Sequence, residues 1–479
     1  MNLKPSESLS ENEVKSGLGY VVKDGLFTEA MTTMTSGAFL VALAIKLGAS
    51  NFQIGLLAAL PTFANVFQLF AISLVRRYNN RRILAIICSF IARFPLLLIA
   101  ALPLMFSAAS AVKAMIFLLF FHYFFGAMVG PMWNSWMKDL VPQKILGSYF
   151  AQRTRLIQIL NVSLSLIVAL SLDYVKLHFP AMEIPAYLLM FIGGGLLGMI
   201  AIFMMSKTPE PKAEPIGENL FRLVSKPLKN KNYRNLIIFQ SVWSFALNLA
   251  TPFFSVYMMK SLHLPLSYII GFTILSQVSS IAFIRIWGKY SDQFSNKTII
   301  SICAPLYVFA ILAWSFTGIA SLTFPLLALI HIITGMTTAG INLGLNNIGL
   351  KLAPANDAIV FLAARNMVTA LVPSLAPIIG GLMADFFLDH DLVAKVGLKG
   401  MNLSHWSFFF AIGSLMALAS LRLLKLVKED GETSREVVVA RMMHRLKIRM
   451  IITFHRRPRN ARLAWMTIPV MNRLFQKKA

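Results

Sequence analysis

Twelve apolar runs of about 20 residues each limit what this chain can fold into more than any other feature of the sequence. A helix of that length spans the hydrocarbon core of a bilayer. The runs are continuously apolar, whereas strands of a membrane barrel alternate in polarity over about ten residues, so helices are expected. The sequence predicts an all-α integral membrane protein with twelve transmembrane helices, which begin near Gly25, Phe52, Ile83, Lys113, Gln152, Glu183, Asn235, Leu264, Ile299, Phe324, Ile359 and Asn402.

The composition excludes a water-soluble protein. Of the 479 residues, 57% are hydrophobic and 14% are charged, and the mean hydropathy is +0.67, which is too apolar for a soluble domain. The net charge of +25 is concentrated in connections and in the C-terminal tail, so it indicates orientation in a membrane, and no nucleic-acid partner is expected. Cys88 and Cys303 lie in separate apolar runs without metal-ligand spacing, and neither a metal nor a cofactor is predicted.

The distribution of lysine and arginine predicts the orientation. The connections after segments 2, 4, 6 and 8 are rich in these cations, whereas the alternate connections carry few. Because cytoplasmic loops of membrane proteins are enriched in Lys and Arg, both termini are expected in the cytoplasm. We predict a multi-pass protein of the plasma (inner) membrane, and we expect it to be a monomer.

A stretch rich in proline and charge follows the sixth run and divides the runs six and six. Such a composition is typical of a linker between domains. The predicted organisation is a cytoplasmic N-terminal segment (1–24), an N-terminal six-helix bundle (25–206), a cytoplasmic linker (207–233), a C-terminal six-helix bundle (234–425) and a basic cytoplasmic tail (426–479).

The tail is the most basic part of the chain, with 13 Lys and Arg residues against four Asp and Glu. Its apolar residues Val438, Met442, Leu446 and Met450 recur at helical spacing. This pattern favours a helix that lies on the anionic headgroups of membrane lipids. A solvated tail is the alternative.

An internal repeat relates the two halves. The offset of 212 residues recurs four times at polar or proline positions, and a second offset, of 216 residues, relates Gly55 to Gly271. Four such matches are not expected from apolar bias alone, so the chain is predicted to contain two pseudo-symmetric six-helix bundles. The positions 212 apart are Asn134 and Asn346, Pro142 and Pro354, Arg153 and Arg365, and Asp173 and Asp385.

Between the eighth and ninth runs, residues 287–298 are expected to form a short polar, cationic loop that carries Gly288, Asp292 and Lys297. Together with the twelve runs, the similar halves and the central linker, this Gly-x-x-x-Asp pattern resembles the major facilitator superfamily over about residues 20 to 425. The equivalent stretch of the first half departs from the pattern, because Ile72 and Arg76 replace its Gly and Asp. The resemblance implies a transporter in which segments 1, 4, 7 and 10 line a central cavity that opens alternately to each side.

The resemblance also places the charged stretches at a cytoplasmic gate. Asp292 would lie near the start of segment 5, where Arg153 or Arg155 and the positive end of that helix can hold it and so favour the outward-facing state. The alternative is a helix-capping or solvated carboxylate. On the other side of the gate, Arg76 would face Arg365, and these like charges cannot form the same contact, so the gate would be held on one side only. The alternative is that anionic lipid headgroups bridge the two arginines.

Two charged residues lie inside predicted spans, where burial is costly. Glu29 is near the start of segment 1 and is a candidate for proton coupling, although an acid that stays ionised in interfacial water is the alternative. Arg93 lies near the middle of segment 3 and requires a partner, which we expect to be backbone carbonyl groups near Pro95, with an anionic solute as the alternative.

Neutral polar and aromatic side chains on the helices expected around the cavity are candidates for solute binding. Taken singly, each is more simply explained by hydrogen bonds between helices. The glycine pairs in segments 4 and 10 have GxxxG spacing, which predicts close helix approach, although the signal is weak. The candidates are Thr33, His122, Asn134, Gln240, Trp243, His331, Asn342 and Asn346.

We therefore expect a secondary active transporter that moves a small organic solute by alternating access, with proton coupling as an option. Neither a catalytic grouping nor a nucleotide-binding loop is visible, so no enzymatic activity is predicted. The alternatives are a flippase or exporter of lipids or other amphipathic compounds, and a receptor or assembly factor that keeps the fold without transport.

Overall fold

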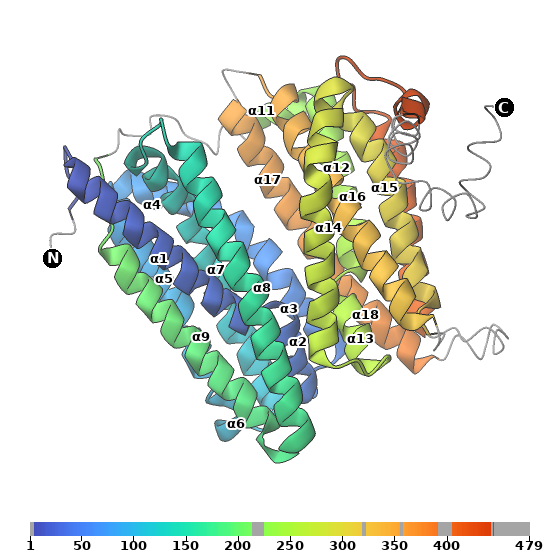
Figure 1. The fold of residues 1–479 in the computed structure, drawn as a ribbon, viewed down its shortest axis with the longest axis horizontal. Coiled ribbons are helices and arrows are strands. Elements are labelled where there is room, and N and C mark those ends of the chain that lie inside the picture. The colour runs from blue at the N-terminus through green and yellow to red at the C-terminus, as the bar shows by residue number, and fades with distance from the viewer. Residues whose placement is uncertain are drawn as a thin grey trace, which may run out of the picture.

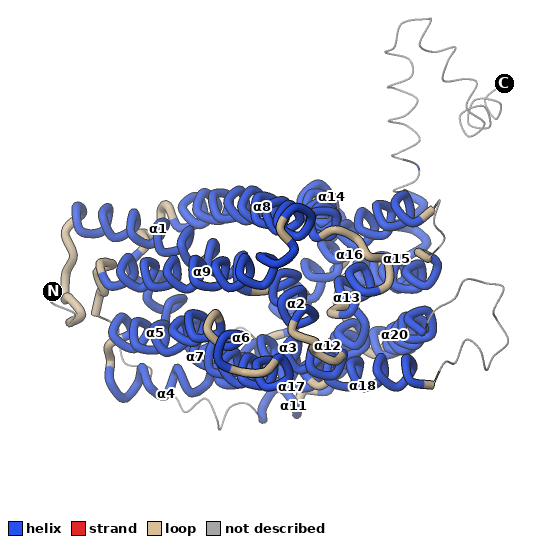
Figure 2. The backbone as a smooth tube through the Cα atoms, turned by 90° about the horizontal axis from the view of Figure 1, so that it is seen from below, coloured by secondary structure: helices blue, strands red, loops and turns tan. Residues whose placement is uncertain are grey.

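The structure is a computed structural model that describes residues 4–212, 225–318, 322–354, 358–390, 405–441 and 444. The helices of this described part form two bundles that stand side by side (Figure 1). Figure 2 shows α8 of the first bundle beside α14 of the second, which agrees with the contacts between these two helices. The predicted all-α fold is confirmed.

The first bundle takes up the N-terminal half of the chain. Side-chain caps set where its helices begin: Ser10 and Glu13 form a capping box at the start of α1, and Ser50 and Gln53 form another at α3. Its elements are α1 (Glu11–Thr35), α2 (Gly37–Lys46), α3 (Asn51–Ala64), η1 (Asn65–Phe67), α4 (Gln68–Tyr78), α5 (Arg81–Ile99), α6 (Leu102–Met105), α7 (Ala108–Leu140), α8 (Leu146–His178), η2 (Pro180–Met182) and α9 (Glu183–Ser206).

The second bundle follows the linker. Its elements are α11 (Ser225–Lys229), α12 (Lys231–Ala250), α13 (Phe253–Lys260), α14 (Leu266–Gln293), α15 (Asn296–Ala313), η3 (Trp314–Phe316), α16 (Thr323–Leu352), α17 (Ala358–Ser374), α18 (Ala376–Asp389) and α20 (His405–Leu424).

The spans agree with the apolar runs of the sequence. In the described part, 11 helical segments are long and apolar enough to cross a membrane, and the shorter apolar helix Asn51–Phe67 continues into α4 as the remaining run. The first span is longer than its apolar run, because α1 begins at Glu11 and extends unbroken through Asp24 to Thr35. Residues 11–24 were expected to lie outside the bundle, but they are helical and form one continuous helix with the first span.

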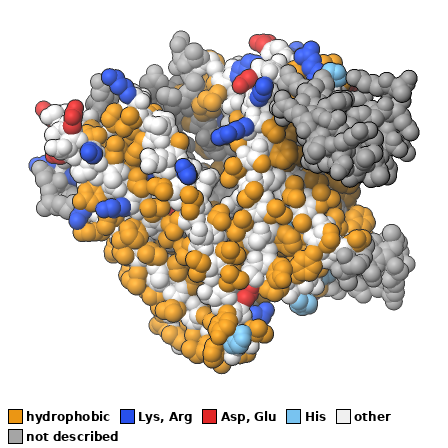
Figure 3. All heavy atoms as spheres, viewed as in Figure 1, with side chains coloured by type: hydrophobic (Ala, Val, Ile, Leu, Met, Phe, Trp, Pro, Cys, Tyr) orange, Lys and Arg blue, Asp and Glu red, His pale blue; other side chains and the backbone are white. Residues whose placement is uncertain are grey.

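Two ends of the bundles must be distinguished. We call the end with the start of α1 and the turn between α4 and α5 the terminal face, and the end with the turn between α2 and α3 the opposite face. Figure 3 shows hydrophobic side chains over the middle of the visible surface and Lys and Arg gathered towards the terminal face. An apolar belt between charged ends is the surface that a bilayer requires.

The polar stretch between segments 8 and 9 is mostly helical rather than a loop. The last turns of α14 run to Gln293, and α15 begins only three residues later at Asn296. Trp287 is buried in this stretch, and its Nε1 donates a hydrogen bond to the carbonyl oxygen of Met336 at 2.8 Å. Its helical character was hidden because polar residues that pack between helices resemble a loop in sequence.

A buried acid after the last helix of each bundle caps the third span of that bundle. Glu210 accepts hydrogen bonds from the backbone N–H groups of Arg81 and Arg82 at 2.8 and 3.0 Å. In the second bundle, Glu429 accepts from the backbone N–H of Lys297 at 2.7 Å and from Asn296 Nδ2 at 2.8 Å. The two bundles are thus stabilised at the terminal face by the same device.

Several contacts act on the charge of Glu429. Burial raises its pKa, but hydrogen bonds from the Lys297 backbone and from the Asn296 and Lys351 side chains lower it, and the net shift is downward. The ionised carboxylate is therefore the form that the folded protein stabilises.

The tail begins against the second bundle. Val438 is fully buried, and the Arg441 guanidinium lies 5.4 Å from the centre of the Phe294 ring. Met442, Leu446 and Met450, the other apolar positions of the expected membrane-surface helix, lie outside the described residues. Since Val438 packs on protein, this first part of the pattern faces the bundle rather than lipid.

Candidate functional site

The two bundles meet tightly near the opposite face. Helix α3 packs on α18, and α8 packs on α14. A side chain at Gly55 would collide with the carbonyl group of Pro377, and one at Gly381 would collide with the backbone of Asn51. Only glycine permits this distance between helices, so these positions allow the bundles to close on each other.

Two carboxylates from one bundle cap helices of the other at this contact. Asp385 of α18 accepts hydrogen bonds from the backbone N–H groups of Asn51 and Phe52, at the start of α3, at 3.2 and 2.9 Å. Asp173 of α8 accepts from Leu266 and its neighbour at the start of α14, at 2.9 and 2.8 Å. Each carboxylate satisfies free N–H groups at a positive helix end, and together they hold the opposite face shut.

Towards the terminal face the bundles diverge (Figure 1). A cavity of about 400 Å³ lies between them, and residues of both bundles line it. Its walls are mostly apolar, with a few polar groups that include Tyr123, Thr251, Ser255, Thr273 and His331. We call this the central cavity. A shape of this kind, apolar with a few placed polar groups, is typical of sites for small molecules.

Two interrupted spans, the first and the seventh, break at the central cavity. The first span breaks at Ser36, and Gly37 has a left-handed φ of 58° with no atom near the place of its missing side chain. The seventh span breaks at Thr251 and Pro252, and Ser36 and Pro252 are related by the 216-residue offset of the repeat. Interrupted helices in matching halves mark the binding site in many transporters, because they expose backbone polar groups near the midplane.

His331 is the sequence candidate that the structure places at the central cavity. Its Nδ1 donates to the carbonyl oxygen of Leu327 at 2.8 Å, and its ring stacks on Phe272 at 5.1 Å between centres. Because Nδ1 is occupied, Nε2 is the nitrogen that remains available to a solute.

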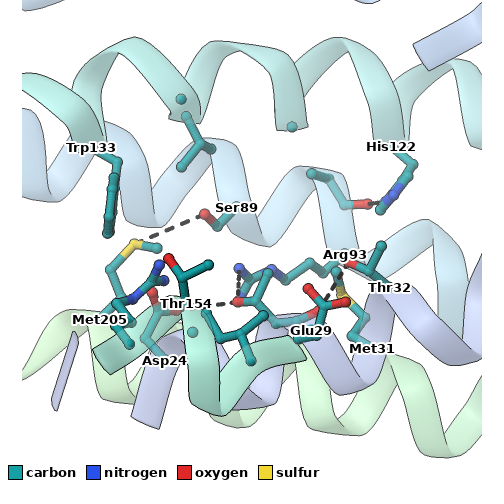
Figure 4. A pocket seen from close by; sticks show the side chains of 18 residues that line it. Asp24, Glu29, Met31, Thr32, Ser89, Arg93, His122, Trp133, Thr154 and Met205 are labelled. Atoms are coloured by element: carbon teal, nitrogen blue, oxygen red, sulfur yellow. Dashed lines mark hydrogen bonds between the residues drawn. The ribbon is translucent and has the colours of Figure 1, made fainter. Parts of the chain in front are cut away.

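A second, larger cavity of about 580 Å³ extends into the first bundle between α1, α5, α7 and α8 (Figure 4). We call it the charged cavity, because Asp24, Glu29, Arg93 and Arg153 all contribute to its lining. Gly126 and Gly130 of α7 face it, and neither has an atom near the place of its missing side chain. This GxxxG pair therefore makes room for the cavity and does not bring two helices together.

Arg93 reaches its expected backbone carbonyl, although not near Pro95. Its Nη1 donates to the carbonyl oxygen of Gly198 on α9 at 2.7 Å, and its Nη2 donates to Thr28 Oγ1 at 3.0 Å. The Thr28 hydroxyl donates in turn to Asp24 at 3.3 Å. Thr28 thus links a buried guanidinium to a buried carboxylate that is only 5% exposed.

Arg153 of α8 lines the same cavity as Asp24. Its guanidinium stacks over Trp133, 4.8 Å from the ring centre, and occupies the space that a side chain at Gly25 would fill. Its Nε donates weakly to the carbonyl oxygen of Val21 at 3.4 Å.

Glu29 and Thr33 share one amide. Asn161 Nδ2 of α8 donates to Glu29 Oε1 at 2.7 Å and lies 3.0 Å from Thr33 Oγ1. His122 of α7 is on the opposite wall, where its Nδ1 donates to the carbonyl oxygen of Ala92 at 2.8 Å. The structure therefore gathers Glu29, His122 and Arg153 around one cavity, as Figure 4 shows for the labelled Glu29 and His122.

Other sequence candidates lie elsewhere. Trp243 is buried in the core of the second bundle beside Phe239 and Tyr307, and the Gln240 Oε1 atom is buried without a hydrogen bond. Asn134, Asn342 and Asn346 are exposed and line neither cavity.

The residues expected at the gate are separated in this structure. Arg365 packs on Gly349 within the second bundle, where it donates to Leu345 O at 3.1 Å and to Asn346 Oδ1 at 3.3 Å. Asp292 is exposed near the end of α14 and forms neither a hydrogen bond nor an ion pair with another described residue. Gly288 lies on the same helix next to α16, and Lys297 pairs through Nζ with Glu432 at 2.8 Å.

Sequence reasoning missed three acids that matter here. Asp173 and Asp385 were visible as a repeated pair, but their partners are backbone groups of the other bundle, which leave no sequence signal. Asp24 lay just before the first apolar run and therefore resembled a residue of the solvated segment. A continuous helical period from Glu11 was the signal that could have placed it inside the bundle.

Known proteins share this fold. A model of the Major Facilitator Superfamily matches residues 25–377 and 236–471, whereas curated proteins give no significant sequence match. A mutant of the nucleoside transporter NupG superposes with a TM-score of 0.65 at 14% identity, over 87% of this chain and 100% of that one. The POT family transporter PepTSo gives 0.64 at 9% identity, over 89% and 100%. The inward-open xylose transporter XylE from E. coli gives 0.60 at 15% identity, over 89% and 99%.

Proposed function

The chain belongs to the Major Facilitator Superfamily, and from this premise we propose that it is a secondary active transporter that moves a small organic solute by alternating access. The observation that carries the proposal is the central cavity, which lies at the breaks of the first and seventh spans, between bundles that are joined at the opposite face and diverge towards the terminal face. A site between two bundles that close on one side is the arrangement that alternating access requires.

We also propose the direction in which this state is open. The connections rich in Lys and Arg are at the terminal face, so this face is cytoplasmic and the structure represents an inward-facing state. In the outward-facing state the caps at Asp173 and Asp385 break, and the bundles approach at the terminal face. The expected contact between Asp292 and the start of α8 would form in that second state, and it is absent from this structure.

For coupling we propose the carboxylates of the charged cavity. Glu29 retains its candidate role, and the buried Asp24 joins it because its carboxylate receives one long hydrogen bond and no ion pair from a described residue. A carboxylate that is buried and weakly paired can exchange a proton when the cavity opens to water.

The charged lining favours a polar solute over the lipid-flippase alternative. Two arginines and two acids around one cavity would each lose hydration if lipid tails filled it, at a cost of several kcal/mol. A small polar solute can instead replace the water that hydrates these groups.

Transport into proteoliposomes tests this function. We would measure uptake of a labelled nucleoside, a pentose, amino acids and dipeptides with and without an imposed pH gradient. If the carboxylates couple transport to protons, Glu29→Gln and Asp24→Asn will each lose the driven component. Asp24→Asn will retain solute exchange, and the exposed Glu11→Gln on the same helix will behave as wild type. A driven rate that survives both substitutions would remove the coupling proposal.

The same vesicles distinguish the alternative functions. Movement of labelled lipid between leaflets without solute uptake would favour a flippase. Specific ligand binding, detected as thermal stabilisation of the purified protein, without any movement of that ligand would favour a receptor.

A further inference from the structure

Building on the proposed function, we propose that the solute is a zwitterion and that the charged cavity of the first bundle is its first binding site, which it occupies before it reaches the central cavity, with its anionic group on Arg153 and its cationic group on Glu29. The proposal names the class of solute, which neither the family nor the fold specifies.

The first support is the unused hydrogen-bonding capacity of Arg153. Only its Nε has an acceptor, at 3.4 Å, and neither terminal nitrogen donates to a described residue. The guanidinium lies over the Trp133 ring and packs against Gly25, so packing restricts its position. A fixed guanidinium whose two terminal nitrogens lack partners is suited to bind a carboxylate through two parallel hydrogen bonds.

The second support is the unused oxygen of Glu29. Asn161 holds Oε1 at 2.7 Å and fixes the carboxylate, while Oε2 accepts no hydrogen bond from a described residue. Arg153 forms neither an ion pair nor a hydrogen bond with this carboxylate, so the two opposite charges line one cavity without pairing. A solute ammonium group would find a charged acceptor there and would still leave Arg153 free for its carboxylate.

The third support is the balance of charge. Besides Glu29 and Arg153, the lining contains Asp24 and Arg93, which are linked through the Thr28 hydroxyl. When all four are ionised, two acids and two arginines give the cavity lining a net charge of zero, with His122 left out of the sum. In a medium of low dielectric constant a net-charged solute would leave an uncompensated charge, whereas a zwitterion adds none.

The fourth support is the shape. A volume of about 580 Å³ exceeds that of a single ion and suits a compact organic molecule. Trp133, Val129 and Ile157 supply apolar surface beside the charges, and the open space at Gly126 and Gly130 leaves room for a side chain of the solute. The wall thus fits a zwitterion that also carries an apolar group.

The test compares compounds that differ only in charge. The thermal unfolding of the purified full-length protein would be followed with leucine and leucyl-leucine, with their amides, which are cations, and with their N-acetyl derivatives, which are anions. The zwitterions should raise the unfolding temperature, and each singly charged derivative should bind roughly tenfold or more weakly, because it leaves one charged partner unsatisfied.

Two substitutions should reverse this preference in opposite directions. Glu29→Gln should favour the N-acetyl derivatives, and Arg153→Gln should favour the amides, while the exposed neighbour Arg155→Gln should keep the wild-type order. Unfolding of each variant without ligand identifies any that fails to fold, and the reciprocal variant then carries the test.

Failure of this inference is separable from failure of transport. If an uncharged nucleoside or pentose stabilises the protein more than any zwitterion, or if no zwitterion stabilises it, the inference is wrong, even where uptake of another solute upholds the transporter. If zwitterions bind with the predicted charge order but never enter vesicles, the binding site stands and the transport function fails.

Discussion

Removal of one carboxylate cap should open the opposite face of the protein. Asp385 accepts two backbone hydrogen bonds at the start of α3, and Asp385→Ala leaves these N–H groups without a partner in the closed state. In the outward-facing state the cap is already broken, so the substitution changes the energy of the inward-facing state only. The equilibrium between the two states must therefore shift towards outward-facing.

The size of the shift follows from the geometry. Replacing a helix N-cap by alanine costs about 0.5–2 kcal/mol, and hydrogen bonds to a charged group contribute about 1.5–3 kcal/mol. Since Asp385 is partly exposed, we take about 1–2 kcal/mol, which is about five- to thirtyfold in the population ratio. Asp173 forms a separate cap at α14, so the double substitution should add, to about 2–4 kcal/mol.

Cysteine labelling measures this ratio. A cysteine introduced at Ala58, which lines the central cavity, should react with a membrane-impermeant thiol reagent added outside cells only when the opposite face opens. The native cysteines Cys88 and Cys303 are both buried and provide a low background. Labelling should accelerate by about five- to thirtyfold in Asp385→Ala.

The matched control is Asp389→Ala, which removes an exposed acid from the same helix without touching the cap. If Asp385→Ala and Asp173→Ala label no faster than this control, the caps do not hold the opposite face shut and our account of the closed state is wrong.

Three further predictions concern stability and packing. Glu429→Gln should lower the unfolding temperature at neutral pH. Because the folded-state pKa of Glu429 lies below its ordinary value of 4.5, the difference in unfolding temperature from wild type should shrink only as the pH falls below about 4.5. A difference that stays constant with pH would contradict this. Gly25→Ala should displace the Arg153 guanidinium that packs on Gly25, and transport should fall. Gly19→Ala should leave transport unchanged, because the new methyl group would meet open space. Gly340→Ala should destabilise the second bundle by about 1–3 kcal/mol in unfolding measurements, because its new methyl group meets neighbouring side chains, and Gly126→Ala should not.

The comparison of these glycine pairs shows where pattern reasoning stops. Gly126 with Gly130 and Gly340 with Gly344 have the same GxxxG spacing in related helices. The second pair packs against the ninth span and Trp287, as the motif predicts, whereas the first faces the charged cavity. The spacing puts both glycines on one helix face, but only the arrangement of neighbouring helices decides what that face meets.

The candidate site was predictable in part for the same reason. Glu29, His122 and His331 were identified because a polar group inside an apolar run requires a partner or a function. Trp243 satisfied the same rule but turns into the core of its bundle. Helical spacing does not state which of several apolar neighbours a side chain will face.

The sequence by itself determined the membrane fold, because the bilayer demands about 20 apolar residues for each spanning helix and leaves few other structures possible. It also determined the duplication, since repeated polar positions survive where apolar ones are interchangeable. Only the tertiary structure decided which charges meet. The carboxylates of Asp173 and Asp385 bind backbone N–H groups of the opposite bundle, and the Arg153 guanidinium rests on a glycine. Such contacts depend on distances between distant segments, and backbone groups carry no residue identity from which a sequence could predict them.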